Sequence, residues 1–145
     1  MLKLRQEQMQ VFQPVAEAAF VRKVSEHLRA RHGDVTARLP GKATTVQALP
    51  EAQLTEMVRK GIARARAYGM TWQSNLGGYV LLLFGVAPNF DAQPLIRRVL
   101  ADERVPADLR LDQLWARTTK KAWQTARQRY DPAAWQISDA SPKRR

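Results

Sequence analysis

The chain of 145 residues contains no cysteine. This absence excludes a disulfide framework, a thiolate metal site and a cysteine nucleophile, and it is compatible with a reducing cytosol. The apolar residues near the start are interrupted by Arg5 and Glu7, so the sequence does not predict a secretion signal. We therefore expect a cytoplasmic protein.

Sets of residues that would carry catalysis or bind a metal are also missing. The two histidines, His27 and His32, are predicted on different faces of one helix, with no carboxylate arranged to complete a metal site. No serine lies in a Gly-x-Ser-x-Gly turn. Asp91 and Asp108 suit helix caps or first turns, where a carboxylate favours the helix dipole. We expect no enzyme activity, cofactor or metal.

Long hydrophobic runs are scarce. The longest, "YVLLLFGVA" at residues 79–87, offers nine apolar positions, whereas a membrane helix needs roughly twenty. The preceding pair Gly77–Gly78 has no strand before it and no Lys-Ser/Thr after it, so a phosphate-binding loop is not predicted. Glycine costs a helix about 1 kcal/mol relative to alanine. The pair therefore indicates a close helix crossing, which we place against Gly61.

Apolar residues recur at spacings of three and four along most of the chain, which is typical of amphipathic helices. Residues 33–50 carry no such stripe and are expected to form a loop or mobile connector. Pro14 predicts a kink, or a short helix followed by a longer one. Thr71 and Asp91 are the expected N-caps of two helices, and Pro94 lies in a first turn. The expected helices cover residues 5–32, 50–69, 72–85, part of 88–102, and 108–130.

These patterns predict an all-α protein, a single compact domain of about five helices with a basic C-terminal arm. We expect no strands, because strands are indicated by alternating period-two runs bounded by turn residues and we interpret the sequence as lacking them. We place the helical domain at residues 1–130 and the basic tail at residues 131–145.

Charge is strongly biased towards one sign. The chain has 24 Lys and Arg against 13 Asp and Glu, a net charge of +11, which favours an acidic protein surface, a nucleic acid or an anionic membrane face as partner. From residue 113 onwards eight basic residues face two acidic ones, so +6 of this charge lies there. The cations of this region are interleaved with aromatic residues, a pattern that fits an interaction surface and equally a solvated basic face.

Within this region Trp115 matches the apolar stripe and is predicted to be core, whereas Trp123 and Trp135 are candidates for partner contact. A second basic face is predicted on the helix over residues 50–69, which also carries Arg66. The candidate partner-binding residues from the two faces are Arg117, Lys120, Lys121, Trp123, Arg127, Arg59, Lys60 and Arg64.

Five stretches resemble a small uncharacterised family of bacterial helical proteins found in type VI secretion gene neighbourhoods, beside spike and effector genes. They are "LKLRQEQMQVF", "FVRKVSEHLR", "MVRKGIARARAYGMT", "YVLLLFGVAPNFDAQP" and "RRVLAD", within residues 1–115. The glycine pair Gly77–Gly78 and the long basic tail depart from the family pattern. The family supplies no catalytic residue to carry over.

The resemblance implies an accessory role near a toxin. Our first hypothesis is a non-enzymatic adaptor or chaperone that binds a type VI secretion effector with an acidic surface. An immunity protein that neutralises the toxin is an alternative that the sequence does not separate from the first. A nucleic-acid-binding protein that uses the basic C-terminal region is the third hypothesis, which lacks a recognisable reading element such as a helix-turn-helix.

Overall fold

The computed structural model describes the backbone of residues 2–136 and the side chains of residues 17–136. This part of the chain is mostly helical, and it contains six α-helices, two short 3-10 helices and one β-hairpin. In order, the elements are α1 (Leu2–His32), β1 (Thr36–Leu39), β2 (Lys42–Thr45), α2 (Glu51–Ala67), α3 (Gln73–Gly85), η1 (Phe90–Ala92), α4 (Pro94–Leu100), α5 (Ala107–Arg117), α6 (Lys120–Gln128) and η2 (Pro132–Trp135).

The prediction of a mostly helical domain is confirmed, but the count of about five helices is not. The last predicted helix is two helices, because the backbone is extended at Thr118 and Thr119 between α5 and α6. Thr119 is the N-cap of α6, since its hydroxyl accepts a hydrogen bond from the Ala122 amide at 3.1 Å. Two threonines in sequence therefore end one helix and begin the next.

The segment expected to be a loop contains a two-stranded antiparallel hairpin, in which Thr36 pairs with Thr45 and Leu39 with Lys42. Its turn is Pro40–Gly41, and Gly41 has a φ of 85°, which glycine adopts without strain. Ala37 and Leu39 point into the core. The alternation of these residues with Thr36 and Arg38, followed by Pro-Gly, was a strand and turn signal that the sequence analysis missed.

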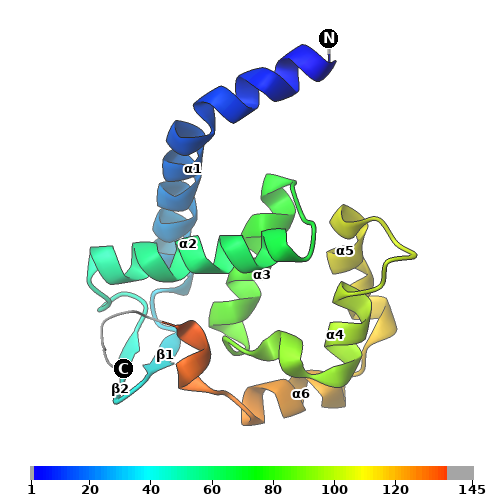
Figure 1. The fold of residues 1–145 in the computed structure, drawn as a ribbon. Helices are drawn as coiled ribbons and strands as arrows, with labels where there is room; N and C mark the ends of the chain where they lie inside the picture. Colours follow the sequence, from blue (N-terminus) through cyan, green and yellow to red (C-terminus); the bar gives the residue numbers. More distant parts are fainter. Residues whose placement is uncertain (1, 137–145) are drawn as a thin grey trace, which may run out of the picture.

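Helix α1 is one uninterrupted helix from Leu2 to His32. Figure 1 shows that its first half projects away from the other elements and bends relative to its second half, which favours a kink over two separate helices. The second half packs on the body through Phe20, Val24 and Leu28, which are four residues apart and share one face of the helix. The body of the fold therefore begins only about halfway along α1.

Helices α2 and α3 form the centre of the fold (Figure 1). They approach closely at Gly61, where an added Cβ would lie 2.7 Å from Leu83 Cδ1 and 3.1 Å from Val80 Cγ2. The predicted crossing is thus present at Gly61, but its partners are two apolar side chains and not the glycine pair. Gly78 instead lies against Leu111 of α5, and Gly77 faces Phe20 of α1.

The packed fold continues past residue 130, where we had placed the domain boundary. Trp135 of η2 is buried, with its ring centroid 4.7 Å from that of Phe84. Its indole N–H donates to the Arg38 carbonyl at 3.1 Å, which joins η2 to β1. Trp135 is therefore a core residue and not a partner contact, and residues 137–145 of the predicted tail lie outside the described part of the chain.

No helix in the described part of the chain is both long and apolar enough to cross a membrane. The apolar run at residues 79–87 instead supplies core residues of α3, among them Tyr79, Val80 and Leu83.

Alanine substitutions at two helical glycines are expected to have opposite effects on stability. At Gly77 the new Cβ would meet nothing closer than Phe20 Cζ at 3.8 Å, so Gly77→Ala should raise the free energy of unfolding by up to about 1 kcal/mol. At Gly61 the same change overpacks the core at Leu83 and Val80. Overpacking costs about 1–3 kcal/mol, which outweighs the gain in helix propensity.

Urea denaturation of both variants measures the two shifts. Gly85→Ala is the control, because a Cβ added at Gly85 meets nothing within 4 Å and Gly85 is the last residue of α3. If Gly61→Ala were as stable as Gly77→Ala, the close α2–α3 crossing would be wrong.

Candidate partner-binding surface

Helix α6 has two contrasting sides. Ala122, Trp123 and Ala126 are buried. Lys120, Lys121 and Arg127 are exposed, as are Gln124 and Gln128. The helix contains no acidic residue. We call the exposed side of Lys120, Lys121 and Arg127 the α6 cationic face.

The two lysines of this face lie in the first turn of α6, where no acidic residue accompanies them. The N-terminal end of a helix carries partial positive charge, so cations there are unfavourable by about 0.3–1 kcal/mol each. No hydrogen bond or ion pair to the side chains of these lysines is found within residues 17–136. Stability of the fold therefore does not explain why lysine occupies both positions.

Arg117, predicted to belong to the same surface, is held by neighbours within the fold. Its guanidinium lies 3.0 Å from the Asp102 carboxylate and donates to the Gln113 side chain at 2.7 Å. Hydrogen bonds from Arg104, with a further one from Arg117, hold the pKa of Asp102 well below its usual range. Arg117 thus fixes the end of α5 to the α4–α5 loop.

The predicted roles of two tryptophans are reversed. Trp123 is buried, and its indole N–H donates to the Thr118 hydroxyl at 2.8 Å. Trp115, predicted to be core, is 64% exposed. The physical reason is that α5 and α6 bury faces of different phase. Helix α5 buries Arg110 and Leu114, which leaves Trp115 outside, and α6 starts with a new rotational phase after the break at Thr118 and Thr119 and buries Trp123. In the sequence, the pair Thr118–Thr119 was the signal of a helix break that could have revealed the exposure of Trp115.

The alternative basic face on α2 is largely engaged in contacts with other elements. Arg64 donates to the Asp91 carboxylate at 2.9 Å and to the Pro88 carbonyl at 2.6 Å. Lys60 contacts Glu56 at 3.6 Å and the Gln136 carbonyl, and Arg66 pairs with Glu17 at 2.6 Å. Arg59 is exposed, and within residues 17–136 no hydrogen bond or ion pair to its side chain is found. The α2 face therefore offers a partner fewer unengaged cations than α6.

Asp91, the ion-pair partner of Arg64, is buried. The prediction that Asp91 is an N-cap is wrong. Asp91 lies inside η1, and the N-cap of α4 is Gln93, whose side chain accepts from the Leu95 and Ile96 amides. The Asp91 carboxylate also accepts hydrogen bonds from the Tyr68 and Tyr79 hydroxyls at 2.7 and 2.8 Å. Burial, together with the nearby carboxylate, raises the pKa of both phenols, which stay protonated as donors. Pro94 occupies the first turn of α4, as predicted.

Asp108 acts as a helix cap, but for a helix other than its own. It lies in the first turn of α5, and its carboxylate accepts from the Thr71 and Trp72 amides at the start of α3 at 2.9 and 3.0 Å. Thr71, the predicted N-cap, donates its hydroxyl to the same carboxylate. Burial by itself raises the pKa of Asp108, but the hydrogen bonds from Thr71, Trp72 and Asn75 outweigh it and lower the pKa to about 2.

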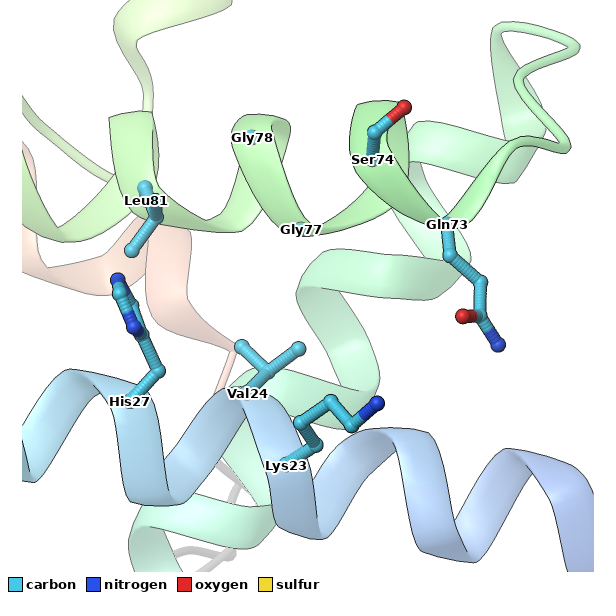
Figure 2. A pocket seen from close by; sticks show the side chains of 8 residues that line it. All are labelled: Lys23, Val24, His27, Gln73, Ser74, Gly77, Gly78 and Leu81. Carbon is cyan, nitrogen blue, oxygen red and sulfur yellow. The ribbon is translucent and has the colours of Figure 1, made fainter.

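A shallow groove of about 300 Å³ lies between α1 and α3. Figure 2 shows Lys23, Val24 and His27 of α1 on one side and α3 with Leu81 on the other. The glycine pair belongs to this groove, since both glycines line it. His27 is exposed, and the side chains described contain no group of histidine, aspartate and glutamate able to hold a metal ion.

Comparisons of the chain with known protein families, with curated proteins and with solved structures found no match.

Replacing Asp108 should weaken the fold in a pH-dependent way. Asp108→Ala removes the cap of α3 and should lower the free energy of unfolding by about 1 kcal/mol at pH 6. The pKa of Asp108 is lowered from 3.8 to about 2 on folding. The stabilisation by Asp108 is thus complete above pH 4 and is lost as the pH falls towards 2.

Denaturation curves of wild type and Asp108→Ala between pH 6 and pH 2 should therefore converge at the acid end. Asp112→Ala, an exposed carboxylate on the same helix, should show no such convergence. A constant difference between wild type and Asp108→Ala across the range would contradict the capping role.

Neutralising Asp91 should lower the free energy of unfolding more than removing one of its neutral hydrogen-bond partners does. Asp91→Asn leaves Arg64 without its counter-charge, and breaking a buried pair from one side costs about 3 kcal/mol or more. Tyr68→Phe removes one hydrogen bond and should cost about 1 kcal/mol. Chemical denaturation ranks the two variants, and an equal loss would show that the charge of Asp91 is unimportant.

Proposed function

We propose that this protein is a non-enzymatic accessory protein that binds an acidic surface of a protein partner through the α6 cationic face. One observation carries the proposal: Lys120, Lys121 and Arg127 are exposed on a helix with no acidic residue. Charge on such a face sets the rate and orientation of encounter with a partner of opposite sign.

The proposed identity of the partner rests on the resemblance described above. Members of that family are found beside type VI secretion effector genes, so the proposed partner is a secreted effector and the proposed role is that of an adaptor or chaperone in the cytoplasm. The cationic face is compatible with this role, because it remains available after the domain has folded. An immunity protein that neutralises the effector would use the same face.

A nucleic-acid partner is less well supported. Proteins that bind single strands combine a basic groove along the backbone with several successive stacking positions. The α6 cationic face lies on one helix of nine residues, and the groove between α1 and α3 is lined by residues of other elements. A single exposed basic helix offers no groove for the strand to follow.

Reversing the charge of the α6 cationic face should weaken binding without unfolding the protein. In the triple variant Lys120→Glu, Lys121→Glu and Arg127→Glu, the first two changes favour the helix dipole and the third opposes it. The free energy of unfolding should therefore change by about 0.5 kcal/mol or less. Affinity for an effector encoded beside the protein should fall at least tenfold at low salt, and the loss should shrink as salt screens the charges.

A matched control carries the same change in net charge elsewhere. Arg22→Glu, Arg31→Glu and Lys42→Glu replace three exposed cations of α1 and β2, none of which is a candidate partner-binding residue. Isothermal titration of the effector with both triple variants compares them directly. If the control loses as much affinity as the α6 variant, only net charge matters and the α6 cationic face is not the site.

The adaptor and immunity roles predict different effects, on the effector itself in the first case and on the survival of cells that make it in the second. Deleting the gene should lower the solubility and secretion of the effector if the protein is an adaptor. Co-expression should rescue cells that make the effector in their own cytosol if the protein confers immunity. Unchanged solubility and secretion would exclude the adaptor role.

A further inference from the structure

Trp115 is the outermost ring of a three-ring stack that runs from the core to the surface. Phe90 is fully buried, and its ring centroid lies 6.2 Å from that of Trp123. The Trp123 ring in turn lies 5.0 Å from that of Trp115, with an interplanar angle of 30°. Trp115 is 64% exposed, whereas Trp123 is 9% exposed. Trp115 thus packs against Trp123 while most of its surface is exposed to solvent.

The support beneath this indole is rigid. Trp123 is held by the hydrogen bond from its indole N–H to Thr118, and Phe90 also packs on Tyr79, with ring centroids 5.1 Å apart. An aromatic side chain that is already fixed loses little conformational freedom when a partner covers it. Tryptophans of this kind are frequent among the residues that dominate binding energy at protein interfaces.

The surroundings of Trp115 carry charge mainly of one sign on the side of α6. Lys120 lies three residues before Trp123 and Arg127 four residues after it, so both lie on the flank of α6 next to Trp123. Asp112 lies three residues before Trp115 on α5 and is the acidic neighbour along that helix. The cationic side of the indole is therefore the side towards α6.

We infer that Trp115 is the anchor of the partner interface, and that it binds an apolar or aromatic side chain flanked by Asp or Glu in an acidic segment of the partner. The apolar side chain covers the exposed surface of Trp115 while the flanking carboxylates meet Lys120 and Arg127. This inference rests on the proposed function, to which it adds the residue at the centre of contact and the chemistry of the segment it recognises.

The test uses two short synthetic peptides, one with a central phenylalanine among glutamates and aspartates, and one with serine in place of the phenylalanine. Each is titrated into the full chain, and the indole N–H signals of the four tryptophans are followed by NMR. The Trp115 signal, assigned from Trp115→Phe, should shift saturably with the phenylalanine peptide. The serine peptide should bind about tenfold more weakly, the range expected for losing an aromatic pair.

Trp115→Ala should lower the affinity for the phenylalanine peptide about tenfold or more and remove the difference between the two peptides. Trp72→Ala is the matched control, because Trp72 is also an exposed tryptophan, at 54%, but precedes α3. That variant should bind both peptides as the wild type does. Circular dichroism verifies that both variants are folded, and the Trp115 shift in the wild-type chain tests the contact without any substitution.

Two outcomes would overturn the anchor while leaving the proposed function intact. One is equal binding of the two peptides, unaffected by Trp115→Ala but abolished by charge reversal on the α6 cationic face. The other is no peptide binding at all, with effector affinity that is sensitive to that charge reversal and insensitive to Trp115→Ala. If charge reversal leaves effector affinity unchanged, the proposed function fails as well.

An oligo-dT strand is titrated in the same way to test a nucleic-acid partner. If it shifts the Trp115 signal at lower concentration than the phenylalanine peptide, with an affinity that falls steeply with salt, the surface is a base-stacking site and the inference is wrong.

Discussion

The buried carboxylate of Asp91 is the constraint on which the arrangement of the helices depends. The carboxylate accepts hydrogen bonds from Arg64 of α2, from Tyr68 at the C-cap of α2 and from Tyr79 of α3. The backbone carbonyl of Asp91 accepts from Arg97 of α4 at 3.0 Å. A buried charge is costly unless it is paired and fully hydrogen-bonded. These three helices therefore meet at one point, and η1, which carries Asp91, also packs against α6. The position of the α6 cationic face depends on this contact.

Helix α5 is tied to the others by charged side chains that complete the ends of neighbouring helices. Asp108 caps the start of α3, and Arg110 donates to the carbonyls of Tyr68 and Leu100 at the ends of α2 and α4, both at 3.0 Å. The partners of Asp108 lie more than thirty residues away in the chain. Local capping rules identified Asp108 as favourable near a helix start, but they do not tell which helix benefits.

The sequence predicted those parts of the fold that depend on local periodicity. The stripe on α2, from Leu54 to Ala65, is buried as expected, because one helix face meets the core along its whole length. Prediction from the sequence failed where the helical phase of the apolar residues changed within a few residues. Extended backbone at Thr118 and Thr119 reset the phase of the last helix, which reversed the roles of Trp115 and Trp123. The exposure of Lys120, Lys121 and Arg127 was still predicted correctly, because their spacing groups them on one side of α6, away from the buried Ala122.

Net charge alone does not locate a binding surface, since +11 is spread along the chain. The structure narrows the choice by showing which cations have internal partners. Arg64, Arg66, Arg110 and Arg117 are all bonded to carboxylates or carbonyls of other elements. Such cations contribute to the stability of the fold. If their side chains turned away to bind a partner protein, the carboxylates and carbonyls that they contact would be left unpaired. The lysines at the start of α6 are the opposite case, because they are unfavourable for their own helix and exposed. This unfavourable placement is the basis on which we propose that the lysines bind a partner, and in that proposal the adjacent exposed indole of Trp115 makes the apolar contact that charge alone does not.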